Sequence, residues 1–210
     1  MRAELAPHAR HGTGVSTGVV AGTDGITRCP WCVSSPDYME YHDREWGRPV
    51  RGDAAIFERI SLEAFQSGLS WLTILRKRPA FRSAFAGFAP ESIAAFGPAD
   101  IGRLMDDAGI VRNHRKIEAT ISNAQAVVRL LDREGEGGLD ALFWSFKPSV
   151  DHGRPATLAD VPAATKASAD LSAALKSIGL AWVGPTTMYA AMQACGLVDD
   201  HLIGCMAAVD

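Results

Sequence analysis

The chain has 210 residues, 47% of them hydrophobic, so it can bury a full core and is most simply one domain. Its formal net charge of −3 excludes a general attraction to nucleic acid, so any DNA contact must come from a local basic surface. The sequence contains neither an apolar run of about 18 residues nor an apolar signal core. We therefore expect a cytoplasmic protein without a membrane segment.

Residues 1–26 carry Gly, Thr, Ser, His and Val without periodicity. Such a composition is typical of a flexible extension. The sequence therefore predicts an N-terminal extension over residues 1–26 and one domain over residues 27–210.

Cysteine and histidine gather at both ends of this domain. Cys29 and Cys32 have the spacing of a zinc knuckle, and His42 follows, while His201 and Cys205 lie far away near the C-terminus. In a reducing compartment such residues are metal ligands or buried thiols rather than disulfides. Five candidates compete for four positions, and spacing alone favours Cys32 over His42. A closed four-ligand site would be structural and would join the two ends of the domain.

A helix of about four turns is predicted after Asp53, a good N-cap. Gly68 can adopt the left-handed conformation that ends a helix, and Ser70 can cap a second helix that begins at Trp71. Apolar residues recur at helical spacing along the first helix: Ile56, Phe57, Ile60 and Ala64.

Glu63 falls on the apolar stripe of this helix, whereas Glu58 and Arg59 are expected on its wet face. Burial of an unpaired carboxylate is costly, so Glu63 either bonds to a neighbouring helix end or serves a cationic or hydrogen-bond-donating ligand. Trp71 follows a tight turn close to Glu63. The pair suits a pocket.

Further helices are predicted over residues 79–85, 90–96, 99–107, 114–131, 168–178 and 185–195, and strand signals are nearly absent. The fold class is therefore all-α. Residues 99–107 and 114–131 are joined through Gly109, and the second of these helices begins among Arg112, His114, Arg115 and Lys116. This is either a phosphate site at a helix N-terminus or a helical hairpin with a solvated basic end.

Several segments together resemble the DNA-3-methyladenine glycosylase I family, a zinc-containing branch of the helix-hairpin-helix base-excision glycosylases. The segments are RCPWC, YMEYHDREWG, LEAFQSGLSW, DDAGIVRNHRKIEA, ALFWSF, ATKASADLSAALKSIG and MQACGLVDDH followed by LIGC, within residues 28–205. The resemblance implies a two-lobed helix-hairpin-helix fold whose N- and C-terminal regions are joined by structural Zn²⁺. The implied ligands are Cys29, His42, His201 and Cys205, and Cys32 departs from the family pattern.

The resemblance also implies a site for a flipped base. Glu63 matches the family's glutamate that recognises the base, and Glu63 is the residue that we expect to be catalytic. Trp71 matches the aromatic residue that stacks on the base. The remaining wall would comprise Trp31, Tyr38, Tyr41 and Trp46. DNA would be held by the wedge Leu69, the hairpin at Gly109, and phosphate contacts from Arg112 and Lys116.

The implied activity is hydrolysis of the N-glycosidic bond of 3-methyladenine in double-stranded DNA containing alkylated bases, leaving an abasic site in base-excision repair. The implied enzyme is a monomer. No lysine is expected in the pocket to form a Schiff base, so the glycosylase would be monofunctional. The alternatives are a zinc-stabilised helical DNA-binding module that lacks catalysis, and a zinc hydrolase, which requires an open metal position.

Overall fold

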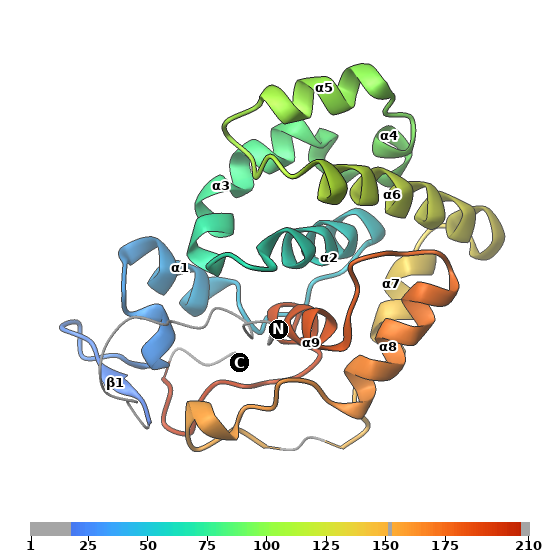
Figure 1. The fold of residues 1–210 in the computed structure, drawn as a ribbon. Coiled ribbons are helices and arrows are strands. Elements are labelled where there is room, and N and C mark those ends of the chain that lie inside the picture. The colour runs from blue at the N-terminus through green and yellow to red at the C-terminus, as the bar shows by residue number, and fades with distance from the viewer. Residues whose placement is uncertain (1–17, 151–152, 207–210) are drawn as a thin grey trace.

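The computed structural model describes residues 18–150 and 153–206, which are mostly helical, as the sequence predicts (Figure 1). Short 3₁₀ helices cover Pro30–Cys32, Ala86–Phe88 and Leu158–Asp160, and β1 (Val20–Ala21) pairs antiparallel with β2 (Thr27–Arg28). The α-helices are α1 (Pro36–Arg44), α2 (Asp53–Gln66), α3 (Trp71–Ala84), α4 (Pro90–Ala94), α5 (Pro98–Asp106), α6 (His114–Glu134), α7 (Gly138–Trp144), α8 (Lys166–Ser177) and α9 (Pro185–Ala194).

Helix α2 is the centre of the fold. It contacts α3, α4 and α6 on one side and α7 and α9 on the other, and Figure 1 shows it between these two groups. Residues 56–66 are all buried. The prediction that Glu58 and Arg59 face solvent is therefore wrong, because other helices cover this side of α2. There Glu58 accepts two hydrogen bonds from Arg82, and Arg59 donates one to Glu45.

The turn after α2 follows the local signals in the sequence. Gly68 has φ +88°, and the Ser70 side chain accepts a hydrogen bond from the Thr73 backbone N–H at the start of α3. The prediction of a separate helix from Pro79 is wrong, because α3 runs through Pro79. Ile74 and Phe81 are buried on either side of Pro79. Their burial offsets the free-energy cost of the backbone hydrogen bond that proline cannot make.

Asp53 does not act as the N-cap of its own helix, which corrects the prediction. It is the first residue of α2, and its carboxylate accepts hydrogen bonds from the backbone N–H groups of Gly137, Leu139 and Asp140 at the start of α7. In return the Asp140 carboxylate accepts from the Gly52 N–H at 2.8 Å. The two helix N-termini cap each other, so α2 and α7 are fixed together.

The two ends of the described chain lie side by side. The Thr27 hydroxyl donates to the Gly204 carbonyl at 2.6 Å, and the Met206 N–H donates to the Thr27 carbonyl at 2.9 Å. The β1–β2 hairpin begins inside the predicted extension of residues 1–26, and residues 1–17 of that extension lie outside the described residues. Among the described residues, none of the helices combines the length and apolarity needed to cross a membrane.

Candidate functional site

Glu63 points into the core, as its position on the apolar stripe predicted. It is 2% exposed, and its Oε2 has no hydrogen-bond partner among the described residues. Burial raises the pKa of Glu63 to about 8, and the charge of Arg59 lowers it by less. A buried carboxyl group without a partner matches the ligand-binding alternative rather than the structural one.

Two aromatic residues from neighbouring helices pack together here, and one of them, Tyr41, lies close to this carboxyl group. Tyr41 on α1 and Trp71 at the start of α3 have ring centroids 5.6 Å apart, and both are buried. Burial raises the pKa of Tyr41, and the nearby Glu63 raises it further. Trp71 Nε1 also lacks a hydrogen-bond partner in the described part of the chain. This group of residues therefore presents aromatic rings, a carboxyl oxygen and an unused N–H donor.

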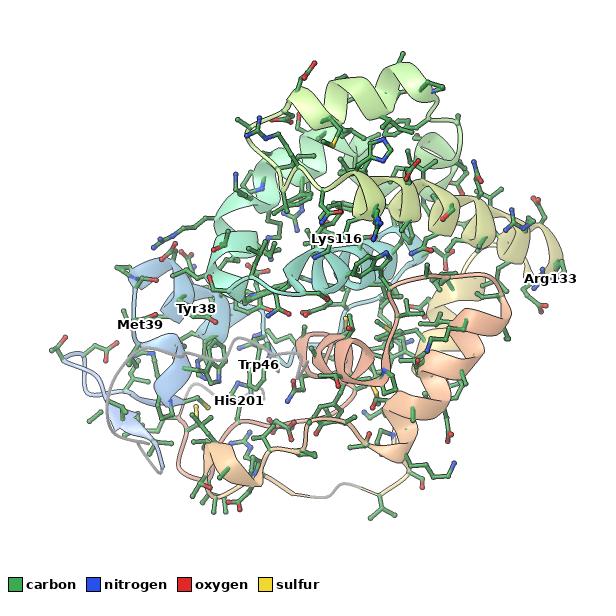
Figure 2. The ribbon with its side chains drawn as sticks, in the orientation of Figure 1. Tyr38, Met39, Trp46, Lys116, Arg133 and His201 are labelled. Carbon is green, nitrogen blue, oxygen red and sulfur yellow. The ribbon has the colours of Figure 1, made fainter. Side chains whose placement is uncertain are left out.

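The other three residues of the predicted wall form a second aromatic cluster. Trp31 lies with its ring centroid 5.1 Å from Tyr38 and 5.0 Å from Trp46, in edge-to-face contacts. Tyr38 lies one helical turn before Tyr41 on α1, so this helix joins the two clusters, and burial raises the pKa of Tyr38. Trp46 packs against His201, with centroids 4.6 Å apart, and Figure 2 shows these two residues together.

The predicted metal ligands are brought together from both ends of the chain. Cys29, His42 and Cys205 have ligand atoms that all lie within 4.8 Å of one another, and all three are buried. His201 has its ring centroid 5.0 Å from that of His42, and its buried Nε2 has no partner among the residues described. Two thiols and two imidazoles in such an arrangement have the donor chemistry of a structural zinc site.

Carboxylates orient both imidazoles. His42 Nδ1 lies 2.8 Å from Asp43 Oδ1, and His201 Nδ1 lies 2.7 Å from Asp199 Oδ1. His42 Nε2 lies 3.6 Å from Cys205 Sγ, and His201 keeps its Nε2 free of hydrogen bonds to the described residues. Carboxylates behind metal-bound histidines orient the rings in this way. Burial alone would raise the pKa of Asp199, but hydrogen bonds from His201 and Arg154 outweigh it and lower the pKa.

Cys32 takes a different position from the one that its spacing favoured. Its Sγ donates to the Cys29 carbonyl at 3.2 Å, and it is outside the group formed by Cys29, His42 and Cys205. Burial raises the pKa of the Cys32 thiol to about 12, so it is a protonated thiol behind the ligand set. The geometry favours His42 over Cys32.

The residues predicted to contact DNA separate into two groups. Leu69 is half-buried on the turn after Gly68, and Arg112 is exposed on the connection between α5 and α6. At Gly109, which lies on the same connection, a Cβ atom would come within 2.8 Å of Ala80 Cβ, so the close packing requires glycine.

Lys116 does not face solvent, which corrects its predicted role in phosphate binding. It is 5% exposed, and its Nζ donates to the carbonyls of Phe65 at 2.9 Å and Ser67 at 2.8 Å. Figure 2 shows it on the first turn of α6. Lys116 satisfies the carbonyls at the C-terminal end of α2, a favourable place for a cation.

Three charged residues of the site were missed from the sequence. Asp43 and Asp199 could have been found, since they lie one and two residues from the histidines that they orient. Arg59 precedes Glu63 by one helical turn but was assigned to the wet face. Its Nη2 donates to Glu45 at 3.2 Å, and its Nη1 is buried without a partner within the described ranges.

The fold and site define a helical protein in which a buried carboxyl group and a group of buried aromatic residues lie beside a Cys/His cluster. Comparison with known proteins agrees with the motifs. Residues 31–208 match the methyladenine glycosylase family. DNA-3-methyladenine glycosylase 1 of Escherichia coli (strain K12) is 45% identical over 183 residues, which cover 86% of this chain and 96% of that protein.

Solved structures agree in fold. The 3-methyladenine DNA glycosylase I of Staphylococcus aureus superposes with a TM-score of 0.81 at 33% identity, covering 87% of this chain and 97% of that chain. A tyrosine-to-phenylalanine variant of a 3-methyladenine DNA glycosylase I in complex with 3-methyladenine superposes with a TM-score of 0.79, also at 33% identity, covering 87% of this chain and 98% of the other. The chain belongs to the methyladenine glycosylase family.

Proposed function

We propose that this protein is a monofunctional DNA glycosylase of base-excision repair, which hydrolyses the N-glycosidic bond of 3-methyladenine in duplex DNA. It releases the free base and leaves an abasic site. The observation that carries the proposal is the unpartnered, buried carboxyl group of Glu63 near Tyr41, whose ring packs against Trp71. The relatives, which are named for this activity, support it.

The chemistry of the damaged base explains this arrangement. Methylation at N3 makes adenine a cation while it is still attached to deoxyribose. A cation is attracted by the faces of aromatic rings and by a carboxylate, so Tyr41, Trp71 and Glu63 select the damaged base by its charge. Binding of the cation favours the ionised form of Glu63, which releases its proton. The cationic base already leaves readily, and we assign no general base.

The Cys/His cluster is proposed to hold structural Zn²⁺. The unused Nε2 of His201 and the carboxylate partners of both histidines fit such an ion. Cys29, His42, His201 and Cys205 would fill its four positions and leave none for an activated water, so the ion would join the chain ends rather than take part in hydrolysis. The adjoining Trp46 would then be held in place behind the pocket.

DNA binding is assigned to the surface where the turn after α2 and the α5–α6 connection meet. The α5–α6 connection is proposed to be the hairpin of a helix-hairpin-helix motif, in which Arg112 contacts a phosphate. The two groups of helices on either side of α2 are proposed to be the two lobes of the protein. Leu69 fills the gap left by the flipped nucleotide, since apolar wedges offset the cost of unstacking. Phosphate contacts position the protein and make affinity dependent on salt.

The test is release of 3-methyladenine from methylated duplex DNA at one fixed salt concentration. Glu63→Gln is expected to lose about ten- to hundredfold in rate, because it removes a charge-assisted contact with the cation. Trp71→Phe keeps a stacking ring and is expected to lose less. Glu91→Gln removes an exposed carboxylate on α4 and serves as the matched control, with an unchanged rate.

Folding of each variant is checked by thermal unfolding, and bound zinc by metal analysis. Release by the wild type with a large loss in Glu63→Gln alone supports the proposal. A folded wild type that binds duplex DNA and releases no 3-methyladenine would leave only the DNA-binding module. Strand cleavage by the wild type without added base would contradict the monofunctional assignment.

A further inference from the structure

Arg59 and Glu63 on α2 each keep one buried polar atom that has no hydrogen-bond partner among the described residues. These atoms are Nη1 of Arg59 and Oε2 of Glu63. The two side chains are buried, and the residues lie four positions apart on the same helix. Residues at that spacing are neighbours on one face, with Cβ atoms about 5–6 Å apart. An acid and a base are therefore buried side by side, and each has an unused atom.

The contact of Arg59 with Glu45 does not neutralise its charge. Arg59 Nη2 donates to Glu45 Oε2 at 3.2 Å, but the same carboxylate accepts two hydrogen bonds from Arg78, each at 2.7 Å. One negative charge is thus shared by two guanidinium groups, and Arg78 makes the shorter contacts. A buried positive charge without a full partner is costly, so we looked for the group that it serves.

The titratable groups that face Glu63 from neighbouring helices are neutral. Tyr38 and Tyr41 lie on α1, and Cys195 lies at the C-terminal end of α9. Burial raises the pKa of each of these groups, and the charge of Glu63 raises it further. At pH 7 they are protonated and supply no countercharge to Glu63.

The charged side chains of the other helices around α2 are engaged elsewhere. Glu91 on α4 is exposed, and α9 carries no charged residue. The others have partners of their own: Arg78 on α3 with Glu45, Arg82 on α3 with Glu58, Lys116 on α6 with the carbonyls of Phe65 and Ser67, and Asp140 on α7 with the Gly52 N–H. Within the described residues, Arg59 is therefore the charge that acts on Glu63.

This placement suits a carboxylate that has to bind a cation. Burial favours the neutral form of Glu63, which attracts a cationic base only weakly, and a positive charge one helical turn away opposes that effect. Because Arg59 makes no hydrogen bond to Glu63, Oε2 is left free for a ligand. A direct salt bridge would ionise the carboxyl group and also occupy it.

We propose that Arg59 is a positioning residue that acts through Glu63, since its guanidinium favours the ionised carboxylate and leaves Oε2 free for the cationic base. The proposal rests on the proposed function, which gives Glu63 that ligand. Glu45 holds the guanidinium in place, and Arg59 itself touches neither the base nor the DNA.

The first test measures the ionisation of Glu63 without DNA, by carbon-13 NMR of full-length protein labelled at the glutamate carboxyl carbons. Glu63→Gln identifies the resonance. Arg59→Met removes the charge and keeps a long unbranched side chain, while Glu45 keeps its bonds from Arg78. The titration midpoint of Glu63 is expected to rise by about 1–2 pH units in Arg59→Met and to stay within roughly half a unit in Arg59→Lys.

Two further variants complete this test. Arg59→Gln is neutral and polar, so it is expected to raise the midpoint as Arg59→Met does and replaces it if Arg59→Met does not fold. Arg82→Met removes a guanidinium that bonds to Glu58 on the same helix, and it is expected to leave the midpoint of Glu63 unchanged. Circular dichroism at each pH checks that every variant is folded.

The second test is the pH profile of 3-methyladenine release from methylated duplex DNA. The ionised form of Glu63 binds the cation, so kcat/KM rises with pH as Glu63 ionises. A higher midpoint moves this rise to higher pH, so kcat/KM of Arg59→Met at pH 7 is expected to fall roughly ten- to hundredfold, with the loss shrinking as the pH increases. Arg59→Lys is expected to stay within about threefold of the wild type. A purely structural defect would lower kcat/KM equally at every pH.

An unchanged midpoint of Glu63 in folded Arg59→Met and Arg59→Gln would overturn the proposal, and so would an equal rise in Arg59→Lys. The NMR titration requires no base release. A wild type that shows the expected midpoints but releases no 3-methyladenine would therefore contradict only the proposed glycosylase activity, whereas release without any change in midpoint would contradict only the role of Arg59.

Discussion

Replacement of Glu63 by glutamine is expected to stabilise the protein at high pH while it lowers the rate of base release. Burial raises the pKa of Glu63 from 4.5 to about 8. A carboxyl group with a raised pKa gives its full contribution to stability below about pH 4.5, and the contribution is lost as the pH rises through about 8. Above that pH the folded wild type contains a buried, unpaired carboxylate. Glutamine at the same position remains neutral.

The size of the effect follows from the shift in pKa. Each pKa unit corresponds to about 1.4 kcal/mol, so the free energy of unfolding of Glu63→Gln should exceed that of the wild type by about 4–5 kcal/mol at pH 9. For a chain of this length the difference corresponds to roughly 10 °C or more in Tm. At pH 4 both side chains are neutral and the two proteins should unfold at nearly the same temperature.

Thermal unfolding followed by circular dichroism at pH 4, 7 and 9 measures this difference. Glu58→Gln is the control on the same helix, because Glu58 already accepts two hydrogen bonds from Arg82. It is expected to be destabilised by about 1 kcal/mol at pH 9, the opposite sign. If the difference in Tm between Glu63→Gln and the wild type stays constant from pH 4 to 9, Glu63 does not have the raised pKa.

Four further substitutions test the metal site and the two capping arrangements. Cys205→Ser is expected to lose bound zinc, measured by plasma emission spectroscopy, and to have a lower Tm. Cys32→Ser is expected to keep one equivalent of zinc. Metal loss in both variants would show that the proposed ligand set is wrong. Lys116→Met removes the donor of the buried Phe65 carbonyl and the part-buried Ser67 carbonyl. The free energy of unfolding in urea should fall by about 2–3 kcal/mol, and an unchanged midpoint would contradict this. Asp53→Ala removes three hydrogen bonds at the start of α7, so the free energy of unfolding in urea should fall by about 2 kcal/mol. A fall of less than a few tenths of a kcal/mol would contradict the capping role.

The sequence by itself determined the features that depend on neighbouring residues. Ser70 caps α3 and Gly68 turns the chain because capping and left-handed backbone depend on a few consecutive residues. The inward direction of Glu63 followed from helical periodicity, which places a side chain on one face whatever lies beyond it. These local signals were sufficient to find the centre of the site.

The tertiary structure decided what covers each face and which distant groups meet. Glu58 and Arg59 looked exposed because a sequence does not show that a second set of helices covers α2. The sequence predicted that Lys116 binds a phosphate, but in the fold its Nζ contacts the C-terminal end of α2, where its partner Phe65 is 51 residues away in the chain. The carboxylate of Asp53 caps Gly137, 84 residues away, rather than its own helix. Partners at such separations are brought together by packing of the whole core, which no local pattern in the sequence records.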